Sequence, residues 1–273
     1  MTDITRPKIS ARSVERVFAA ETDNPVHALG PFDLDIAEGE FCCIVGPSGC
    51  GKSTFLRIVA GLLRPSAGAV EVDLAGTSKT PIAMVFQDYG IYPWKTVEAN
   101  VRFGLEVGGM SKKEARERAL FWLGRLGLTE FRNAYPDKLS GGMRQRVAIA
   151  RALAVEPEIL LMDEPFAALD AQLRQILQEE LLALWEADKR TVLFITHSLE
   201  EAIVLGDRVL VMTARPGRML ESVQVPFDRP RTPELRAEPE FNEFKAGLWD
   251  HLKLQVEQYL NELRTVEEEG DER

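Results

Sequence analysis

Two periodicities of apolar residues alternate along the chain and predict its secondary structure. Short alternating or continuously apolar runs predict strands at residues 9–18, 32–36, 41–45, 70–74, 82–86, 159–162, 192–196 and 209–212. Helical spacing follows residue 54 and recurs within 111–126, 141–155, 173–184 and 241–263. Strands that alternate with helices are typical of α/β folds. We expect the first segment, 9–18, to be an edge strand.

The alternation of strands and helices is interrupted between residues 88 and 156. A Ser-Lys-Lys-Glu capping box at 111–114 predicts a helix start there, whereas 88–109 shows little periodicity and carries several aromatic residues. We therefore expect an inserted helical subdomain at about 88–156.

The composition of the chain changes again after residue 215. Prolines and arginines predict an extended linker, which is followed by an amphipathic helix and an acidic tail. We expect the amphipathic helix to pack back on the body of the protein. The predicted organisation is one domain at 1–220 and a C-terminal extension at 221–273.

The segment between the third predicted strand and the next helix has the pattern of a phosphate-binding loop. It reads Gly46, Pro47, Ser48, Gly49, Cys50, Gly51, Lys52, Ser53 and Thr54. Glycines allow successive backbone N–H groups to point inward, and the following helix N-terminus adds its positive dipole. In such a loop Lys52 reaches the β- and γ-phosphates, and the Ser53 hydroxyl binds Mg²⁺.

Polar side chains follow three other apolar strands, where α/β sheets place ligands. Gln87 follows one strand, the adjacent carboxylates Asp163 and Glu164 follow another, and His197 follows a third. Gln87 is suited to Mg²⁺ or the attacking water, or is a solvated glutamine. One of the two carboxylates is suited to Mg²⁺ through its water shell and the other to the terminal phosphate, while His197 is a phosphate contact or a structural histidine.

Two further segments have weaker signals. The turn Ser140-Gly141-Gly142 opens a helix, so it is either a second anion site or a capped helix start. Phe18, at the end of the first strand, is either a base-stacking aromatic or a core or edge aromatic. Ser198 to Glu201 has the pattern of a second capping box. The aromatic residues from Tyr89 to Trp94 form either a contact surface or a small satellite core.

Bulk properties argue against several classes of function. The net charge is −10, which gives no general field for nucleic acid. Three cysteines without paired spacing indicate reduced thiols and no zinc site. The first eight residues carry no apolar signal core, and no apolar run is long enough to span a bilayer. Work at a membrane would therefore need separate membrane subunits.

Taken together, these motifs resemble the ATPase subunit of ABC transporters over about residues 9–215. The phosphate loop, Gln87, a Leu-Ser-Gly-Gly signature, the Asp-Glu strand end, an Ala-Leu-Asp loop at 168–170 and His197 occur in the family's order. The resemblance implies a P-loop NTPase (RecA-like) core with a mixed sheet, the helical insert and the C-terminal helix. It also implies that two subunits sandwich two ATP molecules with Mg²⁺.

The resemblance assigns a role to each matching residue. The loop from Gly46 to Thr54 would hold the phosphates, with Lys52 as a catalytic group. Ser53, Gln87 and Asp163 would approach Mg²⁺. Glu164 would be the general base, His197 would contact the γ-phosphate, and Phe18 would stack on adenine. Ser140, Gly141 and Gly142 would bind the γ-phosphate of ATP held by the other subunit, and the loop from Tyr89 to Trp94 would meet a helix of the membrane subunits.

The sequence departs from the commonest family pattern at Phe18, Met143, Ala167 and Ser198, without losing a catalytic group. Gly-Gly-Met-Arg-Gln-Arg, Tyr-Pro-Trp and the Arg-Pro linker resemble the nitrate, aliphatic-sulfonate and taurine importer branch. We therefore expect a peripheral ATPase at the cytoplasmic face of the cell membrane. It would work as a homodimer, or as a pair with a similar subunit, with a permease and, indirectly, a solute-binding protein. The alternatives are a soluble ABC ATPase acting on ribosomes or nucleic acid, and a P-loop kinase or GTPase, which leaves the signature and His197 unexplained.

Overall fold

The computed structural model describes residues 6–22, 24–76 and 79–271, and side chains as far as residue 257. The chain forms two compact units. The first comprises residues 1–37, 41–73 and 195–273, and the second comprises 38–40 and 74–194. Among the described residues, no helix is both long and apolar enough to cross a bilayer.

A three-stranded antiparallel sheet forms one part of the first unit. Its order is β2 (Val26–Ile36), β1 (Ile9–Phe18) and β4 (Ala67–Val72). The expected edge position of residues 9–18 is wrong, because β1 pairs with a strand on each side. An antiparallel strand with one wet face has the same mixed polarity in the middle of a sheet as at its edge, so hydropathy does not distinguish the two positions.

Three more strands of the first unit lie together, and the first of them leads into the loop from 46 to 54. The fully buried β3 (Phe41–Val45) runs parallel to β8 (Arg208–Met212), and α1 (Lys52–Val59) follows the loop. Strand β9 (Met219–Gln224) pairs antiparallel with β8. Strand β9 was not expected, because the sequence after residue 215 predicts a linker. No residue of β9 is buried, so it lacks the apolar run that marks β3 and β8.

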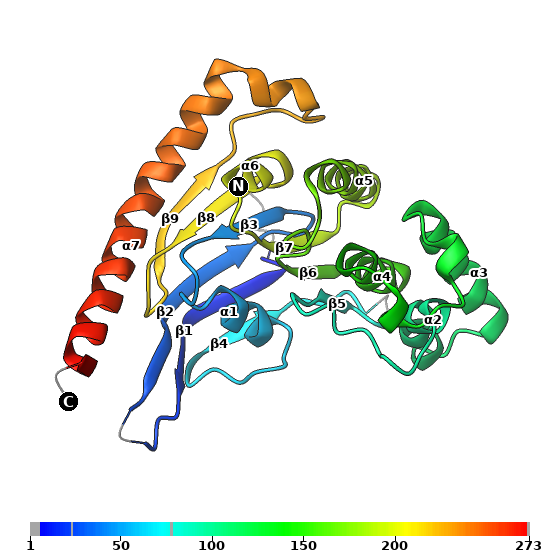
Figure 1. Ribbon diagram of the computed structural model, residues 1–273, viewed down its shortest axis with the longest axis horizontal. Coiled ribbons are helices and arrows are strands. Elements are labelled where there is room, and N and C mark those ends of the chain that lie inside the picture. The colour runs from blue at the N-terminus through cyan, green and yellow to red at the C-terminus, as the bar shows by residue number, and fades with distance from the viewer. Residues whose placement is uncertain (1–5, 23, 77–78, 272–273) are drawn as a thin grey trace. The chain divides into compact units, whose positions relative to one another are not determined.

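The C-terminal segment packs on the first unit, as expected. Helix α7 (Pro239–Asp271) follows the short η3 (Pro233–Ala237) and lies beside β8 (Figure 1). Its residues Phe241, Leu248 and Leu252 are buried. The Phe227 ring lies 5.8 Å from the Phe241 ring. The side chains beyond residue 257, which include the end of the expected 241–263 helix and the acidic tail, lie outside the described part.

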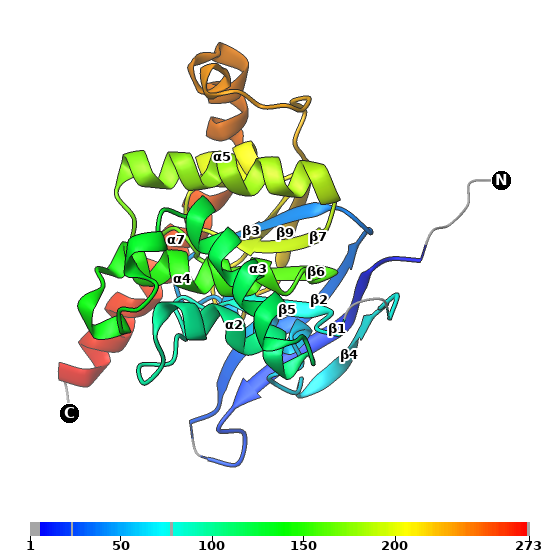
Figure 2. The same ribbon diagram turned by 90° about the vertical axis from the view of Figure 1, so that its right-hand side faces the viewer.

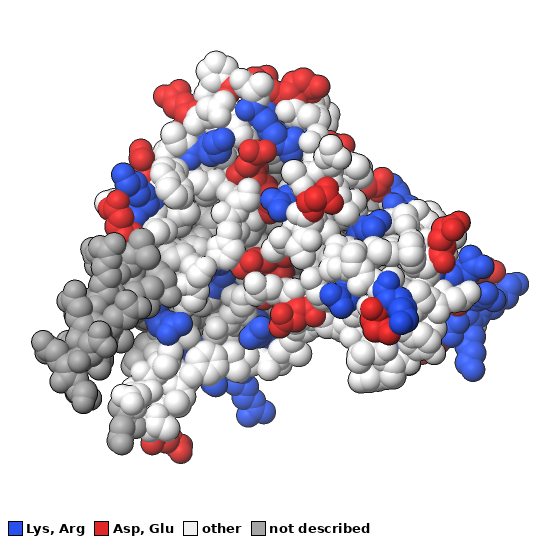
Figure 3. Space-filling view, in the orientation of Figure 1, with Lys and Arg blue, Asp and Glu red and all other residues white. Residues whose placement is uncertain are grey.

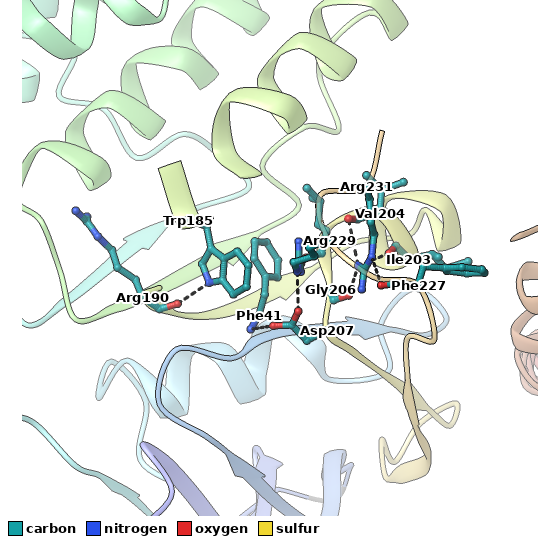
Figure 4. Close-up of polar contacts among 11 residues, drawn as sticks. Phe41, Trp185, Arg190, Ile203, Val204, Gly206, Asp207, Phe227, Arg229 and Arg231 are labelled. Atoms are coloured by element: carbon teal, nitrogen blue, oxygen red, sulfur yellow. Dashed lines mark hydrogen bonds and ion pairs between the residues drawn. The ribbon is translucent and has the colours of Figure 1, made fainter. Parts of the chain in front are cut away.

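Two arginines of the linker fasten this segment to α6 (Leu199–Leu205) (Figure 4). Arg231 is buried and donates to the carbonyl oxygens of Ile203 and Gly206, at 2.7 and 2.5 Å. Arg229 donates to Asp207 Oδ1 at 2.8 Å. These guanidinium groups satisfy carbonyls that the end of a helix leaves without intrahelical partners. Burial lowers the pKa of Arg231 to about 10, where it is still charged at neutral pH.

The second unit contains strands β5 (Ile82–Val85), β6 (Ile159–Asp163) and β7 (Thr191–Ile195), in that order. Strands β5 and β6 are parallel. Strand β6 is entirely buried, as is typical of a central parallel strand. Helix α5 (Ala171–Asp188) begins with Asp170 as its N-cap.

The helices α2 (Val97–Val107), α3 (Lys112–Arg125) and α4 (Gly141–Ala154) pack on one another in the second unit (Figure 2). Two short 3₁₀ turns, η1 (Thr129–Phe131) and η2 (Pro136–Lys138), precede α4. The capping box of α3 is present in both directions between Ser111 and Glu114. Helix α2 was not predicted, because buried polar residues such as Glu98 and Asn100 obscure its apolar stripe.

We predict that Arg231→Met lowers the free energy of unfolding by about 2–4 kcal/mol, because it removes the donors to several buried carbonyls. Urea unfolding measures the effect. The matched control is Arg6→Met, since the Arg6–Glu71 ion pair is 69% and 73% exposed. The control should change stability by less than about 0.5 kcal/mol. Equal losses in both variants would contradict a structural role for the Arg231 contacts.

Candidate functional site

The loop from 46 to 54 closes around the ammonium group of Lys52. Lys52 is only 4% exposed, and its Nζ donates to the carbonyl oxygens of Gly46 and Pro47, both at 2.8 Å. Cys50 Sγ lies 3.8 Å from the same nitrogen. Burial raises the pKa of the Cys50 thiol, so the side chain is a neutral filler of the loop. The positive end of α1 and the Lys52 charge therefore occupy one small region.

Two glycines allow other segments of the first unit to pack closely against the backbone of this loop. Gly51 has φ +107°, and a Cβ there would lie 2.5 Å from the Ala28 carbonyl oxygen. Gly217, in the turn between β8 and β9, packs even more closely against the loop, since a Cβ at this position would lie 1.8 Å from the Cys50 carbonyl oxygen. Arg215, in the same turn, donates to the Gly49 carbonyl oxygen through Nε and Nη2, at 3.3 and 3.2 Å. The sequence analysis missed this turn, whose Arg-Pro-Gly-Arg residues indicate only a change of direction.

His197 belongs to the same unit as the loop and follows a residue paired with β3. The Thr196 backbone N–H donates to the Ile44 carbonyl oxygen at 3.2 Å, two residues before the loop begins. The Thr196 hydroxyl donates to the Glu201 carboxylate at 2.5 Å and accepts from the Ser198 backbone N–H at 3.0 Å. Ser198 Oγ accepts from the Glu201 backbone N–H, which is one half of the predicted capping box. These bonds fix the backbone on both sides of the exposed His197 imidazole.

Phe18 lies at the end of β1, in the same unit, and is 36% exposed. The Arg16 guanidinium lies 4.7 Å from the centre of its ring, which is a cation–π distance. A ring that is neither buried nor fully exposed is compatible with base stacking and with a surface aromatic pair.

The second unit brings together the other polar strand ends. Val85 of β5 is paired with Met162 of β6, so the residues that follow these strands are neighbours. Gln87 Nε2 lies 3.4 Å from Glu164 Oε2 and donates to it. Asp163 is the last residue of β6 and is fully buried. These side chains offer carboxylate and amide oxygens, the donors that Mg²⁺ prefers, as does the Ser53 hydroxyl of the first unit.

The turn from Ser140 to Gly142 also belongs to the second unit. Ser140 is the N-cap of α4, and its Oγ accepts from the Met143 backbone N–H at 3.3 Å. A Cβ on Gly142 would lie 3.0 Å from Leu169 Cδ2, in the loop that follows Glu164. The N-terminus of a 14-residue helix thus lies against the loop that leads away from the carboxylates.

The aromatic segment from 89 to 96 is held by a buried amide that the sequence analysis missed. Asn100 is fully buried, and its side chain bonds to the backbone N–H and carbonyl of Tyr92 and to the carbonyls of Lys95 and Thr96. Tyr92 packs on Phe103, whereas Trp94 is 70% exposed. The backbone of the segment is therefore fixed, its tyrosine rings are half-buried, and it presents one indole to solvent. An asparagine at a core position of α2 was the available sequence signal.

Acidic and basic side chains are interspersed over the face shown in Figure 3, and one group of basic side chains lies at the edge near α3. Helix α3 carries two lysines and three arginines. The described residues drawn on this face show no continuous positive surface of the kind that nucleic-acid backbones require.

Comparisons with known proteins agree with this geometry. A model of the ABC transporter family matches residues 29–167. An uncharacterized ABC transporter ATP-binding protein of Methanocaldococcus jannaschii is 49% identical, over 93% of this chain and 94% of its own. The nitrate import ATP-binding protein of Synechocystis is 45% identical over 84% and 88%, and the taurine import ATP-binding protein of Rhizobium johnstonii is 46% identical over 85% and 91%.

Solved structures show the same fold. One, described as the dimeric post-hydrolysis state of an ATP-binding cassette with bound ADP and Pi, superposes with a TM-score of 0.73 at 34% identity. It covers 81% of this chain and 100% of its own. These relationships confirm the expected α/β P-loop fold with its mixed sheet and the resemblance to the nitrate and taurine branch. The chain belongs to the ABC transporter family and is one of its ATP-binding subunits, an ATPase whose hydrolysis of ATP is coupled to transport.

Proposed function

We propose that this chain energises the import of a small, anionic solute of the nitrate, sulfonate or taurine type through separate membrane subunits. The observation that carries the proposal is the similarity to nitrate and taurine import ATP-binding proteins over more than four fifths of the chain. The chain would lie peripherally at the cytoplasmic face of the membrane. Its partners would be a second copy or a similar ATPase subunit, a permease and, indirectly, a solute-binding protein.

The phosphate loop would bind the nucleotide. Backbone N–H groups from Gly46 to Thr54 would point at the phosphates, and Lys52 would exchange its carbonyl partners for phosphate oxygens. Mg²⁺ would be held by the oxygens of Ser53, Gln87 and Asp163, and it would neutralise charge on the phosphates. Phe18 would stack on the adenine ring.

The second unit would supply the base. Glu164 would take the proton of the attacking water, and Gln87, which donates to its carboxylate, would keep that carboxylate oriented. His197 would donate to the γ-phosphate from a backbone fixed by Thr196. Ser140, Gly141 and Gly142 would contact the γ-phosphate of ATP held by the second copy. Hydrolysis removes the phosphoryl group that both copies contact, so the closed pair loses its preferential stabilisation.

A soluble ABC ATPase that acts on ribosomes or nucleic acid is the second candidate function. The net charge of −10 and the mixed charges of the visible face do not favour it (Figure 3). Gentle membrane solubilisation followed by affinity purification separates the two proposals. Recovery with a polytopic membrane protein supports the importer, whereas recovery only with ribosomes or nucleic acid contradicts it.

We predict that Glu164→Gln retains ATP binding but loses at least about 100-fold in turnover, because an amide cannot accept the proton of the water. ATP-bound pairs should accumulate and be detected by size-exclusion chromatography. Lys52→Ala is the control that removes nucleotide binding, and Ser140→Arg in the Glu164→Gln background should bind ATP without pairing. Near-normal turnover in Glu164→Gln would exclude Glu164 as the general base.

We predict that Gly217→Ala lowers ATP affinity by on the order of tenfold, because its methyl group displaces the Cys50 carbonyl and distorts the phosphate loop. Isothermal titration with ATP measures the change. Gly247→Ala is the matched control, since a Cβ at that position has no atom within 4 Å and the residue lies in α7. Equal affinities for the two variants would show that the turn does not support the loop.

A further inference from the structure

Tyr89 has a backbone conformation that its surroundings must hold in place. Its φ is +63°, in the left-handed region that disfavours residues with a Cβ. Its N–H donates to the Phe86 carbonyl at 3.1 Å. Arg151 of α4 then donates to the Tyr89 carbonyl at 3.3 Å and to the Gly90 carbonyl at 2.6 Å. Strain of this kind persists where neighbouring structure determines the conformation, and it is concentrated at functional sites.

The strained backbone directs the Tyr89 side chain to the first turn of α4. A Cβ on Gly141 would lie 3.1 Å from Tyr89 Oη. The Arg144 guanidinium carbon lies 5.5 Å from the centre of the Tyr89 ring. Arg144 and Arg151 are seven residues apart, two helical turns, so both contacts use the same face of α4. Tyr89 therefore reaches the turn at 140–142 with its hydroxyl group and faces Arg144 with its ring. The same helix holds its carbonyl through Arg151.

The contacts around Arg151 also reach the aromatic segment. The Arg151 guanidinium lies 5.7 Å from the centre of the Tyr92 ring. Tyr92 is fixed in turn by Asn100. The segment that follows Gln87 is thus joined to α4 by hydrogen bonds and ring contacts at several points, rather than by a single flexible loop.

We propose that Tyr89 and Arg151 are positioning residues for the turn Ser140-Gly142. Arg151 holds Tyr89 in its left-handed conformation, and the Tyr89 ring fixes the start of α4 so that its N–H groups are aligned before a second copy approaches. The inference rests on the proposed role of this turn in contacting nucleotide bound to the second copy. In this proposal, Tyr89 and Arg151 do not contact the nucleotide bound to their own copy.

A substitution that relieves the backbone strain but removes the ring can distinguish a positioning role from a role in folding. Asparagine tolerates the left-handed region, so Tyr89→Asn should fold with an unfolding temperature near that of the parent protein. In the Glu164→Gln background, its ATP-dependent pairing should weaken by on the order of tenfold or more. ATP binding by the unpaired copy should not change. Tyr89→Phe keeps the ring and should restore most of the pairing, and Arg151→Met should reproduce the loss.

Lys189→Asn is the matched control for strain relief. Lys189 has φ +50° at the C-terminal end of α5, and it has no role in the proposed sites. The same substitution there should leave pairing unchanged. Pairing is measured by analytical ultracentrifugation with ATP, and ATP binding with a fluorescent nucleotide at low protein concentration.

Each outcome bears on one proposal. Normal pairing by Tyr89→Asn, or a loss that follows a lowered unfolding temperature, would overturn the positioning role. If Ser140→Arg blocks pairing and Tyr89→Asn does not, only the positioning inference fails. If Ser140→Arg itself pairs normally with ATP, the proposed role of the signature turn fails.

Discussion

The curled backbone of residues 46–54 is the constraint on which the rest of the site depends. Its N–H groups can point inward only if the outer side of the loop is packed without a Cβ at two positions, Gly51 and Gly217. Lys52, which is part of the loop, donates hydrogen bonds to two of its carbonyl oxygens, and Arg215, which lies outside the loop, donates to the Gly49 carbonyl oxygen. The loop is thus preorganised by strands β2 and β8 and by a turn far away in sequence, and less ordering is required when an anion binds.

The second unit also combines a helix N-terminus with charged side chains, but here the charged groups are carboxylates. Its carboxylates follow a buried strand, where an oxygen cluster needs a cation or a hydrogen-bond donor. Its helix α4 presents a capped N-terminus, and a strained tyrosine lies against it. Both units therefore contain a helix N-terminus of the kind that binds anions, and in the first unit the buried Lys52 lies beside it. This difference matches the division of labour that we propose between the copy that binds ATP and the copy that completes the site.

The sequence alone was sufficient for the features that depend on local spacing. The loop between β3 and α1, the buried strands that lead to Asp163 and His197, and the capping box of α3 each follow from residues close together in the chain. Features that depend on distant partners were missed or wrong. The central position of β1 requires knowledge of β4, and the half-exposed β9 has no apolar run. The support of Cys50 by Gly217 joins segments more than 160 residues apart, and the strain at Tyr89 appears only in its φ value.

The central claim is that one ATP is contacted by the phosphate loop of one copy and by residues 140–142 of another. Orthovanadate tests it most directly, since with ADP it occupies the place of the transferred phosphoryl group, and ultraviolet light then cleaves the backbone beside it. Mass spectrometry of the trapped protein should find cleavage both within residues 46–54 and at residues 140–142. Cleavage confined to 46–54, with residues 140–142 intact, would contradict the account.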